Sequence, residues 1–381
     1  MNKMTPELLQ QLQCLPLELK IQKSKIRIRE WYEHWDGDVY VSFSGGKDSL
    51  VLLDLVRSVY PEVPAVFSDI GLEYPEVKSF VKTFDNIEII KPRHSFKDIL
   101  TKYGYPIISK EVAGNIDGVR KFIYEKINNN TIRLPNELDV LTNYVKQNVV
   151  NESETLPLLE SEISFRVATL LGILDKQAIL NWNIPKGNNS IYHKKRWQWL
   201  LNSDFKISDK CCYHMKKSPM DKYMHETNRK PYIGTLADES NARRSAWLKH
   251  GCNTYKSHPS SAPLSFWTEQ DILQYIYENN LPLCSVYGEI KLIDGKYECT
   301  KCNRTGCMFC MFGIHYDKEN KRFGQLKQTH PKLYDYCMRG GEYNELGWWQ
   351  PSNNGLGMKH VLDFINMKGN AKERLNETLD K

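Results

Sequence analysis

The sequence predicts an α/β fold in which helices cover both faces of a parallel, twisted sheet. Short runs of β-branched and aromatic residues alternate with helical patterns over residues 49–58 and 75–84; the runs are Asp38–Phe43, Val63–Phe67 and Ile87–Ile90. This alternation favours parallel strands joined by right-handed crossovers. Ligands of such sheets bind at the carboxyl ends of the strands, so we expect the functional site at that edge.

The strand and helix signals also predict how the chain is organised. We expect five regions, in order: a helical lead-in (1–36), the first part of the α/β core (37–114), a mostly helical insertion (115–209), the second part of the core (210–295), and a cysteine-rich metal-binding segment with a C-terminal helical region (296–381). The insertion has its clearest amphipathic helix over Ile163–Leu180. In the second part of the core, Pro231–Gly234 predicts a strand and Phe266–Asn279 a helix.

Composition excludes few classes of partner but constrains the compartment. The 381 residues carry a formal charge of +6, which is too mild to require a polyanion. Residues 1–30 lack the apolar core of a signal peptide, and no run of about 18 apolar residues is present. We therefore expect a cytoplasmic protein without membrane contact. In that reducing compartment the ten cysteines are expected to be thiols or metal ligands rather than disulfides.

A glycine-containing loop follows the first predicted strand. Such a loop leaves backbone N–H groups unobstructed, and the following helix N-terminus adds partial positive charge, so phosphates can bind there. It is not a Walker A loop, because Asp48 follows Lys47 and the upstream glycine is missing. Lys47 and Asp48 are the candidate catalytic residues. The candidate phosphate-binding residues are Ser42, Ser44, Gly45, Gly46, Lys47, Asp48 and Ser49.

Two acidic residues, Asp69 and Glu73, follow the second predicted strand and are therefore expected at the same sheet edge. Carboxylates there are candidates for ligating Mg²⁺ or for binding a ribose hydroxyl. Helix capping is the alternative. A separate segment, His193–Trp199, interleaves basic and aromatic residues as nucleic-acid contacts do, although packing of a basic helix is favoured for it.

Six cysteines fall into two groups, the adjacent pair Cys211 and Cys212 and the series Cys299, Cys302, Cys307 and Cys310. Adjacent α-carbons lie only about 3.8 Å apart, which is shorter than an ordinary disulfide spans, so the pair favours metal ligation. Each Cys-x-x-Cys turn presents two thiolates to one metal. The series alone is a candidate zinc site, although its four-residue middle gap is tight.

The loop Ser44–Ser49, Ser-Gly-Gly-Lys-Asp-Ser after a strand, resembles that of the PP-loop ATP pyrophosphatases, which have the adenine nucleotide alpha hydrolase-like fold. That resemblance implies ATP cleavage between the α and β phosphates. Other segments resemble the narrower phosphoadenosine-phosphosulfate-reductase-like group, over about half the chain and in the same order: Ser68–Glu76, Gly234–Ser240 with Arg244, Pro263–Thr268 and Arg304–Cys310. The resemblance to this narrower group implies that Gly234 and Arg244 bind the nucleotide. A helix-surface ion pair of Arg243 or Arg244 with Glu239 is the alternative.

The same resemblance bears on the cysteines. Assimilatory adenylylsulfate reductases hold a 4Fe-4S cluster with a Cys-Cys pair and a distant Cys-x-x-Cys, an arrangement matched in order by Cys211, Cys212, Cys307 and Cys310. A cluster in which Cys302 replaces one member of the pair and a Zn²⁺ site from Cys299, Cys302, Cys307 and Cys310 are the alternatives.

Departures from the family pattern indicate which chemistry to expect. Sulfonucleotide reductases usually have an altered phosphate loop and act through a cysteine in a C-terminal Glu-Cys-Gly-(Ile or Leu)-His motif. Here Lys47 is present, and the last cysteine, Cys337, lies in Asp335-Tyr336-Cys337-Met338. The chain is thus more similar to the thiolation branch, which includes the DNA-phosphorothioation PP-loop component.

That branch implies ATP and Mg²⁺ as ligands, adenylation of an acceptor oxygen, and sulfur transfer to DNA, RNA or a small molecule, with a sulfur-donor protein as a further partner. Two alternatives remain open. One is reduction of phosphoadenosine phosphosulfate or adenylyl sulfate to sulfite. The other is a non-catalytic nucleotide-binding or DNA-binding subunit.

Overall fold

The computed structural model describes residues 4–148, 165–172, 194–256, 258–317 and 321–367. The chain forms two compact units, the first from residues 1–93 and 214–308 and the second from residues 94–213 and 309–381. The expected core and insertion have other bounds, since residues 94–114 and the segment after 308 fall in the second unit. These two segments group together because their strands, Ile107–Ile108 and Met311–Phe312, pair with each other.

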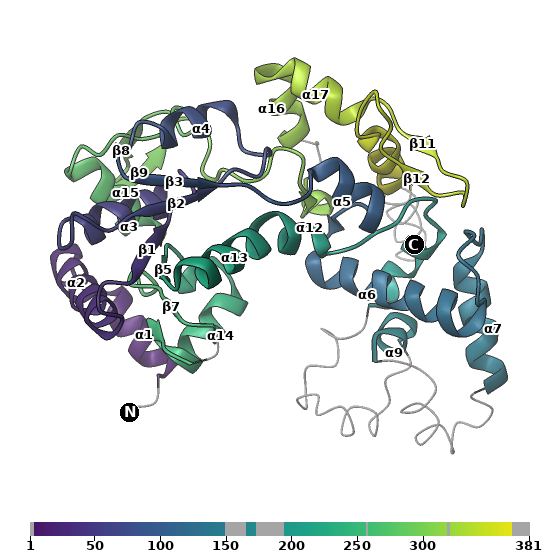
Figure 1. The fold of residues 1–381 in the computed structure, drawn as a ribbon, viewed down its shortest axis with the longest axis horizontal. Helices are drawn as coiled ribbons and strands as arrows, with labels where there is room; N and C mark the ends of the chain where they lie inside the picture. The colour runs from purple at the N-terminus through teal and green to yellow at the C-terminus, as the bar shows by residue number, and fades with distance from the viewer. Residues whose placement is uncertain (1–3, 149–164, 173–193, 257, 318–320, 368–381) are drawn as a thin grey trace. The chain divides into compact units, whose positions relative to one another are not determined.

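The first unit contains a six-stranded sheet in the order β3-β2-β1-β5-β7-β6 (Figure 1). All neighbours pair in parallel except β6 and β7, which confirms the predicted parallel-dominated α/β fold. The strands are β1 (Val39–Ser42), β2 (Ala65–Ser68), β3 (Ile87–Ile90), β5 (Lys230–Ile233), β6 (Asn253–Thr254) and β7 (Ser260–Ser261).

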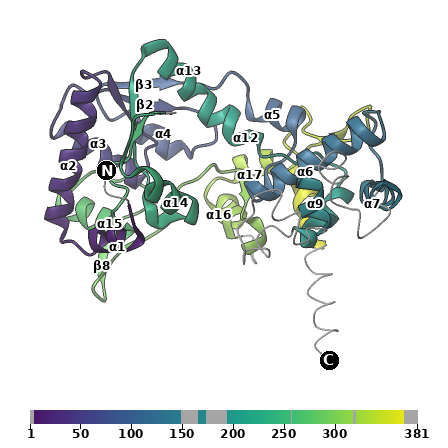
Figure 2. The same ribbon diagram turned by 90° about the horizontal axis from the view of Figure 1, so that it is seen from below.

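Helices cover both faces of this sheet (Figure 1, Figure 2). They are α1 (Pro6–Gln13), α2 (Leu17–His34), α3 (Lys47–Arg57), α4 (Pro75–Val81), α13 (Ser218–Thr227), α14 (Asn241–His250) and α15 (Glu269–Glu278). Shorter elements of the unit are η4 (Ala237–Glu239) and the hairpin of β8 (Ile290–Ile293) and β9 (Lys296–Cys299), and the π-helix η3 (Tyr213–Lys217) begins at the unit boundary.

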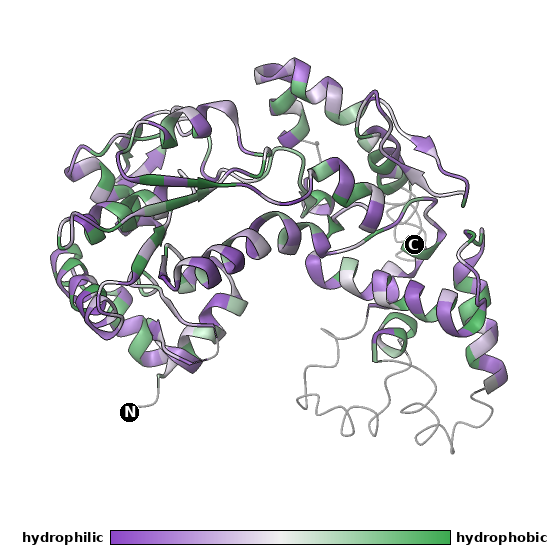
Figure 3. Cartoon of the chain, in the orientation of Figure 1, coloured by the Kyte–Doolittle hydropathy of each residue, from purple (hydrophilic) through white to green (hydrophobic). Residues whose placement is uncertain are grey.

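Strand β1 shows why the central strands are largely apolar. Val39 and Val41 join the core formed with α2, α3 and α15, while Tyr40, on the opposite face, packs with Tyr223 of α13. Successive side chains of a strand point to opposite faces, so a strand covered on both sides is hydrophobic at every position. Figure 3 shows this as green over the central strands. The carboxyl ends of β1 and β2 are consequently rigid platforms for the loops that follow them.

The second unit begins at residue 94, and its described residues are mostly helical. Its elements are α5 (Phe96–Tyr103), β4 (Ile107–Ile108), α6 (Lys110–Phe122), η1 (Ile123–Ile127), α7 (Glu137–Asn148), α9 (Phe165–Leu171), η2 (Lys195–Asn202), α12 (Lys210–Cys212), β10 (Met311–Phe312), η5 (Ile314–Tyr316), α16 (Lys321–Thr329), α17 (Pro331–Met338), β11 (Glu342–Tyr343) and β12 (Trp349–Gln350). Helix α9 lies within the predicted helix at 163–180, whose other residues, apart from Gly172, are outside the described ones. Within the described ranges, no helix has the length and apolar character needed to cross a membrane.

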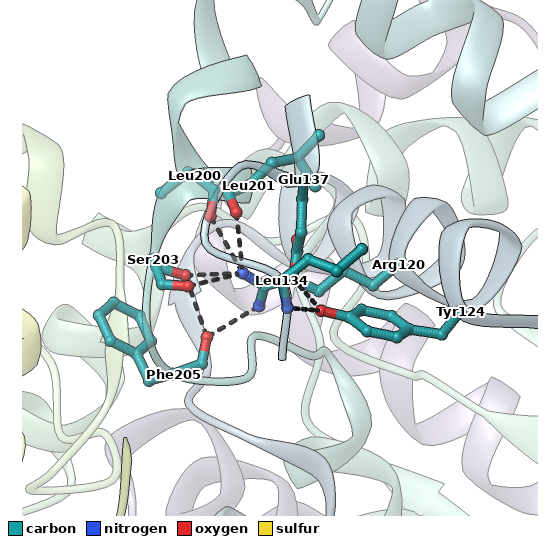
Figure 4. A network of polar contacts seen from close by, with 8 residues as sticks. All are labelled: Arg120, Tyr124, Leu134, Glu137, Leu200, Leu201, Ser203 and Phe205. Carbon is teal, nitrogen blue, oxygen red and sulfur yellow. Dashed lines mark hydrogen bonds and ion pairs between the residues drawn. The ribbon is translucent and has the colours of Figure 1, made fainter. Parts of the chain in front are cut away.

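A buried ion pair organises the second unit (Figure 4). The Arg120 guanidinium donates to the Glu137 carboxylate at 2.8 Å and also to backbone carbonyls of the segment 200–205. Tyr124 donates to the other Glu137 oxygen at 2.8 Å. Arg120 is 6% and Glu137 0% exposed, so the pair is desolvated but its hydrogen bonds are well satisfied.

Replacing Arg120 by methionine should destabilise the protein by about 3–5 kcal/mol, because Glu137 would remain buried without its counter-charge. Urea unfolding followed by tryptophan fluorescence measures the change. The matched control is Lys121→Met, which removes an exposed pair with Asp117 and should change stability by no more than about 0.5 kcal/mol. Equal effects of the two substitutions would contradict a structural role for the network.

Candidate nucleotide-binding site

The predicted phosphate loop lies between β1 and α3, at the carboxyl edge of the sheet. Ser44 and Ser49 hold the loop closed, since their hydroxyl oxygens lie 3.0 Å apart and Ser49 donates to the Gly46 carbonyl at 2.9 Å. Gly46 is the N-cap of α3 and makes no side-chain capping bond. The first turn of an eleven-residue helix therefore lies next to the loop, an arrangement suited to binding phosphate.

Glycine is required at two positions of the site, because neighbouring atoms lie too close to leave room for a side chain. Gly45 has φ +70°, and a Cβ there would lie 2.8 Å from Val77 Cγ1 of α4. Gly234 follows β5, and a Cβ there would lie 3.1 Å from the Asp48 carbonyl carbon and from the Ser49 amide nitrogen. Such distances are shorter than ordinary van der Waals contacts, so neither position accepts a side chain without movement of the loop or of α3.

Lys47 begins α3 and is only 4% exposed. Its ammonium forms an ion pair with Glu269 at the start of α15 and donates to the Asn303 carbonyl at 2.7 Å. The Lys47 amide donates to the hydroxyl of Tyr287, which also contacts Thr305 Oγ1 at 2.8 Å, and burial raises the pKa of Tyr287 to about 12. Glu269, Asn303 and Tyr287 were not predicted, because nothing local to their sequence marks them as partners of the loop.

A small polar cavity of about 120 Å³ opens beside Lys47, and Asp48 contributes to its wall. Burial raises the pKa of Asp48, Lys47 opposes that shift and Glu269 adds to it. The lining residues are Lys47, Asp48, Leu236, Asp238, Glu239, Glu269 and Arg304. With four carboxylates and two cations, this phosphate-side cavity is suited to a group that carries charge.

A second cavity, of about 220 Å³, lies on the other side of the loop at the ends of β1 and β2. Ser42, Ser44 and Glu73, all predicted, line it together with Phe43, Val66, Phe67, Ser68, Tyr74, Val77, Lys216, Met220, Thr305, Gly306 and Cys307. The lining thus combines apolar and polar side chains, as sites for small organic ligands do. We call it the nucleoside-side cavity, because the phosphate loop separates it from the charged cavity beside Lys47.

Asp69 and Arg244 lie apart from both cavities. Asp69 forms an ion pair with Lys78 at 2.6 Å and accepts a hydrogen bond from the Gly71 amide at 3.1 Å. Burial by itself would raise the pKa of Asp69, but these contacts outweigh it and lower that pKa. Arg244 is exposed on α14 and lines neither cavity. Its neighbour Arg243 pairs with Glu239 and faces Asp48. Burial lowers the pKa of Arg243, and the negative charge of Asp48 opposes that shift. Helical phase therefore directs Arg243, rather than Arg244, towards the loop.

The predicted metal ligands are distributed over the two units. Cys211, Cys212 and Cys310 belong to the second unit, whereas Cys307 belongs to the first. Cys299 and Cys302 pack against the core of the first unit, and burial raises the pKa of both thiols. Among the residues that the structure describes, no three His, Cys, Asp or Glu side chains converge to hold a metal ion. The ligand set therefore stays a prediction.

The basic and aromatic segment favoured for packing lies in the second unit, and its residues from Lys194 onward are described. The ring of Trp197 is 9% exposed and contacts His315 at a centroid distance of 5.2 Å. Trp199 contacts Phe364 at 5.5 Å. Both rings thus contribute to internal packing rather than to an open stacking surface.

Gly234→Ala should weaken binding of an adenine nucleotide at least about tenfold, because a close backbone approach to α3 leaves no room for a methyl group. Isothermal titration with a non-hydrolysable ATP analogue measures the effect. Gly324→Ala, at a glycine of helix α16 with open space around its Cβ position and no left-handed φ, is the control and should leave affinity unchanged. Unaltered affinity in Gly234→Ala would show that the close approach at this position does not contribute to nucleotide binding.

Comparison with known proteins identifies the family. The model of the phosphoadenosine phosphosulfate reductase domain matches residues 38–122 and 177–312, more than half of the chain. An uncharacterised protein of Methanocaldococcus jannaschii is 35% identical over 96 residues, 23% of this chain and 23% of its own length. The adenosine 5'-phosphosulfate reductase of Bacillus pumilus is 30% identical over 83 residues, 22% of this chain and 33% of its own.

Among solved structures, phosphoadenylyl-sulfate reductase from Candida auris, in a phosphate complex, aligns over 74% of this chain and 90% of that chain, with 14% identity and a TM-score of 0.33. The curated relatives are matched over short segments, less than a quarter of the length of the Methanocaldococcus protein and a third of the Bacillus reductase. The family assignment rests on the domain match. This chain belongs to the phosphoadenosine phosphosulfate reductase domain family.

Proposed function

We propose that this protein binds ATP and cleaves it between the α and β phosphates to adenylate an acceptor, as part of sulfur transfer to a nucleic acid or a small molecule. The observation that carries the proposal is the unaltered loop Ser44–Ser49, with the buried Lys47 at the first turn of α3. A buried ammonium at a helix N-terminus stabilises negative charge on a departing phosphate group more strongly than it would in water.

In the proposed reaction an acceptor oxygen attacks the α-phosphorus of ATP, the bond from that phosphorus to the bridging oxygen breaks, and pyrophosphate leaves. Lys47 and the amides of the loop stabilise the charge on pyrophosphate. The nucleoside-side cavity holds the adenosine. Asp48 fits a Mg²⁺ site, because that ion is usually bound by one or two carboxylates together with substrate phosphates, and the ion would neutralise developing charge.

Sulfonucleotide reduction is the second candidate, because the Bacillus relative is named as an adenosine 5'-phosphosulfate reductase. That chemistry needs a reactive cysteine, and thiols react as accessible thiolates. Cys337, the last cysteine of the sequence, is 0% exposed on α17 and donates to the Met358 sulfur at 3.1 Å. Burial raises the pKa of its thiol. These features favour the ATP reaction over a reductase that uses Cys337.

Purified protein with ATP and Mg²⁺ should release pyrophosphate, most rapidly with acceptor RNA or DNA present, and Lys47→Ala should reduce that rate by about 100-fold or more. A coupled pyrophosphate assay measures it. Lys82→Ala, an exposed lysine of the same unit, is the control and should retain full activity. Orthophosphate as the sole product would refute α–β cleavage. Sulfite released from adenylyl sulfate with a thiol donor would instead support reduction, while nucleotide binding without turnover would support a non-catalytic subunit.

We further propose a 4Fe-4S cluster held by Cys211, Cys212, Cys307 and Cys310. The supporting observation is their chemistry and spacing in the sequence. Since no three candidate ligands converge within the described residues, we derive no reaction step through the cluster.

Anaerobically purified protein should be brown, with broad absorption near about 400 nm and about four iron atoms per chain. Cys307→Ser should lose the iron, whereas Cys299→Ser should keep it. Iron analysis and absorption spectra measure both. Colourless protein with stoichiometric zinc that is lost in Cys299→Ser would establish the local zinc site and contradict the cluster.

A further inference from the structure

The nucleoside-side cavity contains two polar atoms that lack partners. Ser68 Oγ, at the end of β2, and Glu73 Oε2, five residues later, are buried and form no hydrogen bond. Both residues line the cavity. Buried oxygens without a donor are rare in folded proteins, because desolvation is not compensated. Their presence at a cavity wall indicates that a ligand supplies hydrogen bonds there.

The neighbouring Asp69 is different. It was an equal candidate by sequence, but its Oδ1 atom already forms an ion pair with Lys78 and accepts a hydrogen bond from the Gly71 amide. Asp69 does not line the cavity. The contrast assigns the acceptor role at this end of the cavity to Glu73.

The electrostatic surroundings of Glu73 are mixed. Lys216, on the cavity wall, and Lys78 favour its ionised form, whereas Asp69 disfavours it. Burial is the largest influence and raises the pKa of Glu73. Lys78 is paired with Asp69, and Lys216 is the cation that lines the cavity with Glu73. An ionised carboxylate accepts hydrogen bonds and donates none.

We propose that Glu73, assisted by Ser68, accepts a hydrogen bond from a free ribose hydroxyl and thereby selects adenine nucleotides whose ribose is not phosphorylated. A ribose hydroxyl donates to the carboxylate. A 3'-phosphate offers mainly acceptor oxygens and carries about −1.5 to −2 charge, so it is repelled. This inference rests on the proposed binding of an adenine nucleotide in the nucleoside-side cavity. It admits ATP or adenylyl sulfate and excludes 3'-phosphorylated sulfonucleotides.

The test is equilibrium binding to the full chain, so that it does not depend on turnover. The ligands are AMP and adenosine 3',5'-bisphosphate, which differ by one phosphate, and ATP with a methylene group between the α and β phosphates. Wild-type protein should bind AMP at least about tenfold more tightly than the bisphosphate, as expected for a buried carboxylate that loses a donor and meets a like charge.

Glu73→Gln should reduce that preference to about threefold or less and weaken binding of the methylene analogue about tenfold, because a charged acceptor is replaced by a neutral one. The same substitution should raise the melting temperature of the protein without nucleotide. The reason is that a raised pKa in the folded state means that the ionised form opposes folding at neutral pH. Asp85→Asn, which removes an exposed carboxylate of the same unit, should change neither quantity.

Equal affinities for AMP and the bisphosphate in wild-type protein would overturn the inference. So would an unchanged preference in Glu73→Gln, or a fall in both affinity and melting temperature, which would indicate a merely structural residue. Failure of the proposed function gives a different result. In that case pyrophosphate is not released, while the nucleotide preference and its dependence on Glu73 persist.

Discussion

The candidate site depends on how closely three backbone segments approach the first turn of α3. Gly45 turns under α4, Gly46 caps the helix, and Gly234 brings the end of β5 against Asp48 and Ser49. A Cβ at Gly45 would collide with Val77 of α4, and one at Gly234 would crowd the backbone of Asp48 and Ser49. The loop is therefore held in one conformation by contact rather than by its own hydrogen bonds alone. Lys47 is placed at the edge of the sheet as a consequence.

The loop also separates two environments. On one side, the phosphate-side cavity is strongly charged, with four carboxylates beside Lys47 and Arg304. On the other side, the nucleoside-side cavity combines apolar side chains such as Phe43 and Val66 with polar ones such as Ser44 and Glu73. A nucleotide likewise has a charged chain at one end and a ring system with polar groups at the other. Among the described side chains there is no preformed triad of metal ligands.

Membership of the reductase domain family and a proposal of ATP cleavage are compatible, because a fold hosts different chemistries through its site residues. Two features of this chain bear on the choice, an unaltered phosphate loop and a last cysteine that is buried against Met358. The same principle applies to Glu73, whose unsatisfied oxygen bears on which nucleotide is accepted. Each argument concerns an individual side chain rather than the family.

The sequence by itself determined the parallel α/β sheet and the strand-loop-helix at Ser42–Ser49, because hydrophobic periodicity and glycine placement are local properties of the chain. For the same reason, the bounds predicted from the sequence for β1 and α3 were nearly right. Only the tertiary structure decided the unit boundary near residue 93, since pairing of β4 with β10 joins segments about 200 residues apart.

Tertiary structure also decided the partners of the site. Lys47 meets Glu269 and the Asn303 carbonyl across separations of 222 and 256 residues, which no local pattern encodes. Helical phase distinguished Arg243 from Arg244, and an ion pair with Lys78 distinguished Asp69 from Glu73. The sequence supplied the chemical groups. Which of them face the same cavity, and which are satisfied elsewhere, follows from packing between distant segments.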